Sequence, residues 1–370
     1  LWYVNMKHFM ILVLITFFIK YNQCLTPISL VKTFENGVKA YSEERWSKCI
    51  EKFELSLHLY KQYKSVVINC RLKCNNEFYE PQVKESIEDL KIYEAYFTKR
   101  KCINKCQEEG FSGLNLDSNP GENILMEMNN KKPYEYLHIC YYQMRMFQKA
   151  ALAAYTYLMA NPNDETMKAN IKYYVEQPEI DINEVFDLEG NDYLLLYNLG
   201  KRSYSRGNWA ETVASMEEVL KDYIYSESVC RAECEQQPGQ EWSSELVITL
   251  SNNMASLLHC RQQCQDKLKS LNYNSGIEFL ADILNYLQMS YYHLEKYEDA
   301  SEAVASYLIL MPNDVDMIAN EKFYMELVDE KIPSKRSEIE FYQKRDKYEK
   351  KLLLLFHQED GGINVDSNSI

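Results

Sequence analysis

Glycine, proline and positive charge are all in short supply in this sequence. Only 11 glycines and 9 prolines occur among 370 residues, which disfavours both a β-sandwich with many tight turns and a glycine-rich nucleotide-binding fold. The net charge is −14. Because nucleic acids and anionic membranes are bound through basic patches, neither is expected as the main partner. The hydrophobic fraction of 46% is nevertheless ample for packed cores.

Recognisable catalytic motifs are missing as well. The sequence has no His-Glu-x-x-His, no Gly-x-Ser-x-Gly, no phosphate-binding loop and no dinucleotide fingerprint. An iron/2-oxoglutarate site would need His-x-Asp or His-x-Glu together with a distal histidine. None of the histidines after the first 24 residues forms such a set: His58, His138, His259, His293 and His357. The sequence therefore predicts no catalytic residue, no cofactor and no metal site.

Long apolar runs are confined to the first 24 residues. Lys7-His8 precede the apolar run Phe9–Ile19, which is followed by polar residues up to Cys24. This run is too short to span a bilayer, so we expect residues 1–24 to be a secretory signal peptide, with 1–5 as an upstream extension. No later segment is long and apolar enough to predict a membrane span. The chain lacks a Lys-Asp-Glu-Leu-type ending, so we expect retention in the endoplasmic reticulum lumen by a partner, or secretion.

What the sequence does contain is an internal duplication. Tyr136–Tyr174 is repeated as Tyr286–Tyr324, and matching residues lie at a constant offset of 150. An upstream block returns at an offset of 163. Duplication of this kind is typical of helical repeat proteins, in which each repeat packs on its neighbours. We therefore predict an all-α, duplicated tetratricopeptide-like solenoid.

The spacing of apolar residues and helix stops predicts individual helices. We expect helices to end near Tyr41 and to span Trp46–Tyr60, Pro133–Tyr142, Gln148–Ala160, Glu165–Tyr174 and Ser334–Leu355. Most of the characteristic residues of a tetratricopeptide repeat are present in each copy. The predicted repeat-core residues are Gly37, Trp46, Tyr141, Ala150, Pro162, Gly200, Trp209, Tyr291, Ala300 and Pro312.

The duplication also predicts the domain organisation. We expect a first helical module at residues 25–190, a second at 191–330, a capping helix at 331–358 and a disordered tail at 359–370. The apolar run Leu352–Phe356 of the capping helix should be buried.

Eight cysteines form four Cys-x-x-x-Cys pairs, two in each copy: Cys70/Cys74, Cys102/Cys106, Cys230/Cys234 and Cys260/Cys264. Zinc sites and redox-active motifs are the alternatives to structural disulfides, and the expected secretory signal favours disulfides. A bond within one helical turn is disfavoured by the distance between its Cβ atoms. Three pairings exist for each copy, and we favour Cys70–Cys106 with Cys74–Cys102, and likewise in the second copy.

Two further features admit two interpretations each. Cys49 and Cys140 correspond to Thr212 and Ser290 in the other copy, which favours small packing residues over functional thiols. The 30 tyrosines include Tyr141, Tyr157 and Tyr173, which lie at helical spacing. They could line grooves for polyproline II ligands such as collagen chains, but packing between helices is the favoured interpretation.

The duplicated blocks separated by paired cysteines resemble the leprecan family over residues 30–355. The motifs that carry the resemblance are Gly37…Tyr41…Trp46, Gly200…Tyr204…Trp209, the four Cys-x-x-x-Cys pairs and the Pro-x-Asp-x-x-Met blocks that begin at Pro162 and Pro312. Some members of this family, the prolyl 3-hydroxylases, join such a region to a dioxygenase domain. Another form has the helical region alone, and this chain resembles that non-catalytic form.

The resemblance implies a helper subunit of the endoplasmic reticulum. Its implied partners are a prolyl 3-hydroxylase, a cyclophilin-type peptidyl-prolyl isomerase and unfolded procollagen chains. One alternative is an incomplete prolyl 3-hydroxylase whose catalytic half is missing from the sequence. Others are a generic secretory tetratricopeptide adaptor and a helper of lysine hydroxylation.

Overall fold

The structure is a computed structural model that describes residues 28–76, 91–181, 184–190, 192–235, 246–269, 275–328 and 333–357. Within these ranges it contains fourteen helices and no strand, and one isolated bridge joins Ile28 to Leu116. The prediction of an all-α fold is therefore confirmed. The predicted signal peptide and the tail from residue 359 lie outside the described residues.

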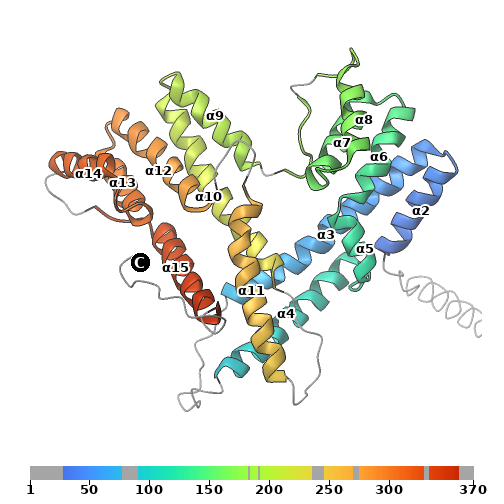
Figure 1. The fold of residues 1–370 in the computed structure, drawn as a ribbon, viewed down its shortest axis with the longest axis horizontal. Coiled ribbons are helices and arrows are strands. Elements are labelled where there is room, and N and C mark those ends of the chain that lie inside the picture. The colour runs from blue at the N-terminus through green and yellow to red at the C-terminus, as the bar shows by residue number, and fades with distance from the viewer. Residues whose placement is uncertain are drawn as a thin grey trace, which may run out of the picture. The chain divides into compact units, whose positions relative to one another are not determined.

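The chain divides into two compact units, residues 1–190 and 191–370, each with its own hydrophobic core. In the first unit, α2 packs on α3, α6 on α7 and α7 on α8, while α3 also contacts α4 and α6 (Figure 1). The helices of this unit are α2 (Leu30–Ser42), α3 (Trp46–Asn76), α4 (Lys91–Leu114), α5 (Glu122–Asn129), α6 (Lys132–Gln143), α7 (Phe147–Ala160) and α8 (Glu165–Val175).

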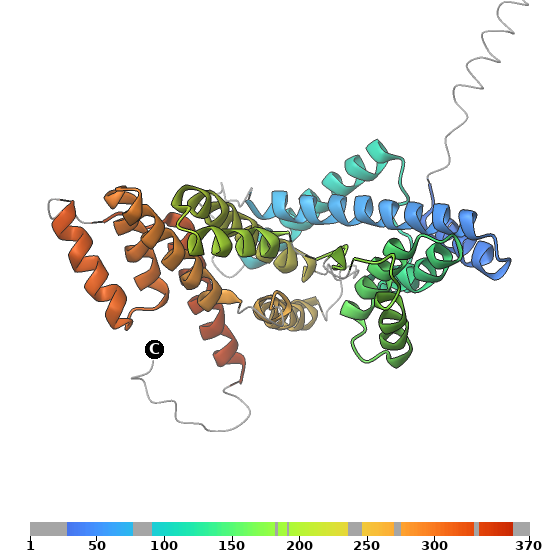
Figure 2. The ribbon, with the colours of Figure 1, turned by 90° about the horizontal axis from the view of Figure 1, so that it is seen from above.

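Among the described residues, the second unit repeats this succession without a counterpart of α5 and adds a final helix. Figure 2 shows α12, α13 and α14 following one another as neighbours, and α15 contacts both α11 and α13. The helices of this unit are α9 (Tyr193–Ser205), α10 (Trp209–Glu233), α11 (Leu246–Lys267), α12 (Gly276–His293), α13 (Tyr297–Leu310), α14 (Val315–Leu327) and α15 (Ser337–His357).

The duplicated sequence builds duplicated helix boundaries. Asp164 and Asp314 cap α8 and α14, because each carboxylate accepts the backbone N–H of a methionine three residues later, at 2.9 Å and 3.1 Å. Each turn between paired helices contains one residue in the left-handed region: Glu44, Arg145, Gly207 and Glu295, with φ between 55° and 71°. Only one of these four is glycine, so the turn geometry is retained even where the residue type does not favour it.

Two glycines let the first helices of each copy pack closely. A Cβ added to Gly37 would lie 3.0 Å from the ring of Phe53, and one added to Gly200 would lie 2.8 Å from Cε of Met216. These are equivalent positions of the two copies. The sequence thus specifies glycine where a second helix crosses α2 and α9.

The long helix α3 differs from the sequence expectation. It was predicted to end at Tyr60, but it continues to Asn76 and so carries both Cys70 and Cys74. No proline or glycine interrupts the sequence between these positions, so no local signal stops the helix.

The capping helix α15 is present, but the predicted burial of the run Leu352–Phe356 is wrong for its last two leucines, whereas Leu352 and Leu353 are partly buried. Leu354 and Leu355 are 49% and 56% exposed. The buried residues of α15 lie nearer its start and include two acids: Ile339, Tyr342, Asp346 and Glu349. The helix packs through these earlier residues, which contact charged and polar side chains of α10 and α11. Leu354 and Leu355 lie beyond this contact and are therefore exposed.

Candidate functional site

Two disulfides join the distal part of α3 to α4. Cys70 is bonded to Cys106 with a Cα–Cα distance of 5.6 Å, and Cys74 to Cys102 with a distance of 6.0 Å. The two helices run in opposite directions, so the cysteine nearer the end of α3 meets the one nearer the start of α4. This is the cross-helix pairing that the sequence favoured. The two bonds fasten the last turns of α3 to the middle of α4.

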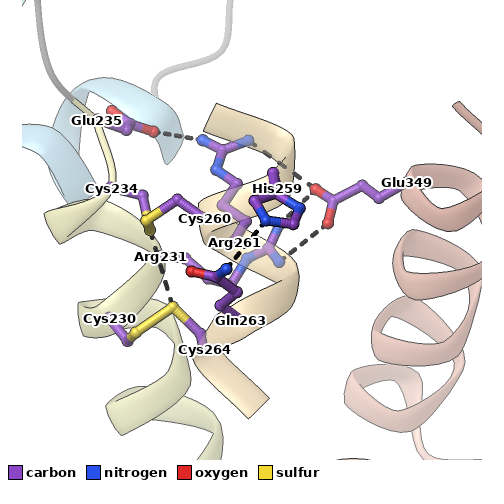
Figure 3. The surroundings of a disulfide bond; sticks show 10 residues. All are labelled: Cys230, Arg231, Cys234, Glu235, His259, Cys260, Arg261, Gln263, Cys264 and Glu349. Carbon is purple, nitrogen blue, oxygen red and sulfur yellow. Dashed lines mark hydrogen bonds and ion pairs between the residues drawn. A yellow bond between two sulfur atoms is a disulfide. The ribbon is translucent and has the colours of Figure 1, made fainter. Parts of the chain in front are cut away.

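The second unit contains the same arrangement between α10 and α11. Cys230 is bonded to Cys264 and Cys234 to Cys260, each with a Cα–Cα distance of 5.8 Å (Figure 3). Cys264 is completely buried and Cys230 is 9% exposed. Within the described part of the chain, no group of histidine, cysteine and acidic residues could hold a metal ion.

A fifth disulfide joins Cys49 on α3 to Cys140 on α6, and here the sequence prediction of two simple packing residues is wrong. The Cα atoms lie 6.4 Å apart and both residues are fully buried. The two cysteines are 91 residues apart in sequence, so only the packing of α6 on α3 shows that they meet. One clue was available, since the second copy replaces both cysteines at once, by Thr212 and Ser290.

A buried ionic network surrounds the second cystine hairpin and holds α15 against it. Arg231 of α10 binds both carboxylate oxygens of Glu349, at 2.5 Å and 3.0 Å. Arg261 of α11 binds Glu235 at 2.5 Å and lies 3.9 Å from Glu349. In Figure 3 both guanidinium groups extend from neighbouring turns of the cystine-linked helices toward Glu349 of α15. Burial would raise the pKa of Glu349, but Arg231 outweighs it and lowers the pKa.

A second group of charges extends the network along α15. Arg345 binds Glu227 of α10 at 2.6 Å, and Gln265 of α11 donates to Asp346 at 3.0 Å. The Glu227 side chain is only 2% exposed. Burial raises its pKa despite the neighbouring Arg345. Because buried charges are stable only when paired, this face of α15 fixes the position of the helix on α10 and α11.

The predicted repeat-core residues fall into three environments. Gly37, Gly200, Ala150 and Ala300 lie in tight contacts between helices, and both alanines are fully buried. Trp46 and Trp209 are half-buried at the start of α3 and α10. They lie edge-on to Tyr41 and Tyr204, with ring centroids 5.9 Å and 5.3 Å apart. The prolines are exposed in the turns that follow α7 and α13, so they end helices without entering the core: Pro162 and Pro312.

Tyr141 and Tyr291 each place a phenol against a glutamate of the preceding long helix. The Tyr141 hydroxyl donates to Glu54 and the Tyr291 hydroxyl to Glu217, each at 2.7 Å. Their rings are 7% and 8% exposed. Burial, then the hydrogen bond to the carboxylate, raises the pKa of both phenols, so they stay neutral donors. These two tyrosines pack between helices and make a part-buried polar contact.

Two of the exposed aromatic residues lie at equivalent positions of α8 and α14. Tyr173 is 48% exposed and its counterpart Phe323 is 44% exposed. Tyr173 shares a hydrogen bond of 2.8 Å with Tyr142, and Phe323 packs on Tyr292 with ring centroids 5.8 Å apart. Both copies therefore present an aromatic pair to solvent at the same place. The packing interpretation holds for Tyr157, which is 7% exposed, and not for Tyr173.

No helix among the described residues combines the length and the apolar character that a membrane span requires.

Comparison with known proteins identifies the family. The family described as "Leprecan family TPR-like repeat region" matches residues 29–328. Prolyl 3-hydroxylase 1 of Gallus gallus is 28% identical over 354 residues, covering 91% of this chain and 48% of the relative. Cartilage-associated protein of Homo sapiens is 27% identical over 301 residues, covering 80% of this chain and 74% of the relative.

The chain thus spans about half the length (48%) of the prolyl 3-hydroxylases that it resembles. The expected resemblance is confirmed, and so is the tetratricopeptide-like character of the repeats. Because the family match extends over both helical units, from α2 to the end of α14, this protein belongs to the leprecan family.

Proposed function

We propose that this protein is a non-enzymatic helper subunit of a procollagen prolyl 3-hydroxylation complex in the lumen of the endoplasmic reticulum. The observation that carries the proposal is the family match over residues 29–328 together with similarity to cartilage-associated protein over 74% of that relative's length. The resemblance to the family implies that a member of this kind has the helical region alone, without a dioxygenase domain. In this role the chain binds a prolyl 3-hydroxylase, a cyclophilin-type isomerase and unfolded procollagen chains.

The geometry is compatible with a scaffold. Two helical units, stiffened by five disulfides, provide broad rigid surfaces for partner proteins. The exposed pairs Tyr142/Tyr173 and Tyr292/Phe323 offer aromatic faces on which an extended proline-rich chain could pack. Disulfides persist in oxidising compartments, which agrees with the expected lumenal location.

The second candidate is the helical part of a prolyl 3-hydroxylase. The observation that favours it is similarity over 91% of this chain to prolyl 3-hydroxylase 1 of Gallus gallus, at 28% identity. Sequencing the full-length transcript discriminates between the two candidates. A downstream reading frame with His-x-Asp and a distal histidine would replace the helper proposal by an enzyme.

The proposal is tested by recovering the tagged protein from its own secretory pathway under mild conditions and identifying bound proteins by mass spectrometry. We expect a prolyl 3-hydroxylase and a cyclophilin in near-stoichiometric amounts. Purified chain alone should not turn over 2-oxoglutarate with a procollagen peptide and Fe(II), whereas the reconstituted complex should. Recovery of the chain alone, or with unrelated partners only, would contradict the proposal.

A second experiment tests the aromatic faces. Tyr173→Ala and Phe323→Ala remove exposed rings, and the matched control Tyr348→Ala removes another exposed ring, on α15. If the faces bind unfolded procollagen, the first two variants lose retention on a column of heat-denatured procollagen and the control does not. Equal retention by all three variants would place procollagen binding elsewhere.

A further inference from the structure

The two copies use the same carboxylate–phenol pair in different ways. In the second unit the pair is Glu217 with Tyr291, and in the first it is Glu54 with Tyr141, with the same 2.7 Å hydrogen bond in each. The glutamates are equivalent at the offset of 163 and the tyrosines at the offset of 150. The pairs are therefore direct structural counterparts.

In the second unit an arginine forms an ion pair with the glutamate of this carboxylate–phenol pair. Arg336, which precedes α15, donates through both terminal nitrogens to Glu217, at 2.9 Å and 2.5 Å. The side chains of Arg336 and Glu217 are 10% and 25% exposed. Burial would raise the pKa of Glu217, but the hydrogen bond and charge of Arg336 outweigh it and lower the pKa. The bidentate geometry is the one that a guanidinium makes best with a carboxylate.

The backbone position of Arg336 also has a counterpart in the first unit. The N–H of Arg336 donates to the hydroxyl of Ser306 at 2.9 Å, and the N–H of Leu188 donates to the hydroxyl of Thr156 at 2.9 Å. Ser306 and Thr156 are themselves equivalent at the offset of 150. Each hydroxyl also donates to the carbonyl four residues earlier, at 2.7 Å and 2.9 Å. Leu188 therefore occupies the place of Arg336.

As a result, the Glu54 carboxylate of the first unit is not covered by a guanidinium and is partly exposed to solvent. The Glu54 side chain is 48% exposed, and its nearest cation is Lys149, 4.0 Å away and itself 54% exposed. Leu188 is 45% exposed and carries no charge. Among the residues that the structure describes, no arginine forms an ion pair with Glu54.

We infer that Glu54 and Tyr141 form a docking site for an arginine side chain on an extended segment of a partner polypeptide. The Arg336 guanidinium shows how such a side chain is seated, because both of its terminal nitrogens bond to Glu217. The backbone place of Arg336 is taken by Leu188 in the first unit, so only the side-chain contact is open to a partner there. Arginine fits better than lysine, since only a planar guanidinium can engage both carboxylate oxygens at once. This inference concerns recognition of arginine and is independent of the proposed role in prolyl hydroxylation.

The direct test measures the binding of a labelled peptide to the full chain by fluorescence anisotropy at low salt. The peptide has the sequence of residues 333–338, Pro-Ser-Lys-Arg-Ser-Glu. Glu54→Gln should weaken binding about tenfold, as expected for loss of one charge-assisted contact. The matched control is Glu51→Gln on the same helix, whose side chain is 61% exposed and pairs with its neighbour Lys52. The control should bind as the unmodified protein does, and a peptide with glutamine in place of arginine should bind weakly to all three proteins.

A second variant tests the geometry from within the chain. Leu188→Arg places a guanidinium where the second unit has Arg336, so it should block the peptide and raise the Tm. In the Glu54→Gln background the same substitution should leave the Tm unchanged. Peptide binding that is equal in the Glu54→Gln and Glu51→Gln proteins, undetectable at about 1 mM peptide, or unaffected by Leu188→Arg would overturn the inference.

Discussion

His138 makes the first unit sensitive to acid in a way that the second unit is not. Its imidazole is 2% exposed on α6, and its Nδ1 lies 2.9 Å from the hydroxyl of Tyr174 on α8. The equivalent residue of the second unit is Gln288, whose side-chain oxygen accepts from Tyr324 at 2.6 Å. The same contact between two helices is thus made by a titratable group in one copy and by a neutral amide in the other.

The size of the effect follows from the pKa of the imidazole. Burial lowers the pKa of His138 to about 4, whereas an exposed histidine has a pKa of about 6.5. As the pH falls, the unfolded chain therefore takes up the proton first. The stability present above pH 6.5 is lost as the pH falls toward the folded pKa, and the loss reaches about 3 kcal/mol by pH 4.

The perturbation is His138→Gln, which gives the first unit the residue that the second unit has at the equivalent position, Gln288. The free energy of unfolding in urea should be measured from pH 7 to pH 4 for this variant and for the unmodified protein. We expect the difference between the two proteins to change by about 3 kcal/mol in favour of the variant as the pH falls. Other titrating groups are shared by both proteins and cancel in this difference.

The reverse substitution is the matched control. Gln288→His should make the second unit sensitive to acid, because Gln288 is 1% exposed and the imidazole would meet the same burial. If His138→Gln and the unmodified protein lose stability in parallel between pH 7 and pH 4, the imidazole is not held neutral and the reasoning is refuted.

Three further variants test how the helices are held together. Replacing Cys49 by threonine and Cys140 by serine, the residues of the second copy, should cost about 2–5 kcal/mol on chemical unfolding, and an unchanged midpoint would contradict a structural role for the bond. Arg345→Met leaves the buried Glu227 unpaired and should cost about 3–5 kcal/mol, seen as early loss of α15 protection in hydrogen exchange. Trp209→Ala should cost about 2 kcal/mol in thermal unfolding, because the ring is half-buried, and a loss of 4 kcal/mol or more would mean that it belongs to the core.

Local signals in the sequence were sufficient for the helices of the duplicated blocks. The caps at Asp164 and Asp314 and the stops before Pro162 and Pro312 depend on residues within one or two turns, and the structure has helix boundaries within a residue or two of those positions. The cystine pairing between α3 and α4 is the one that the sequence favoured among three, because two helices joined in a hairpin can align two cysteine pairs in only a few ways. Where no local breaker was present, as beyond Tyr60, the predicted boundary was wrong.

The sequence by itself determined the family, the all-α class, the duplication and the secondary structure of its blocks. Only the tertiary structure decided which distant side chains meet: Cys49 with Cys140, Glu227 with Arg345 and Glu217 with Arg336, at separations of 91 to 119 residues. The physical reason is that helix propensity and capping act between near neighbours in sequence, whereas these contacts depend on which faces of the helices come together. The exposure of Glu54 is decided in the same way, since it depends on Leu188 standing where the second unit has Arg336.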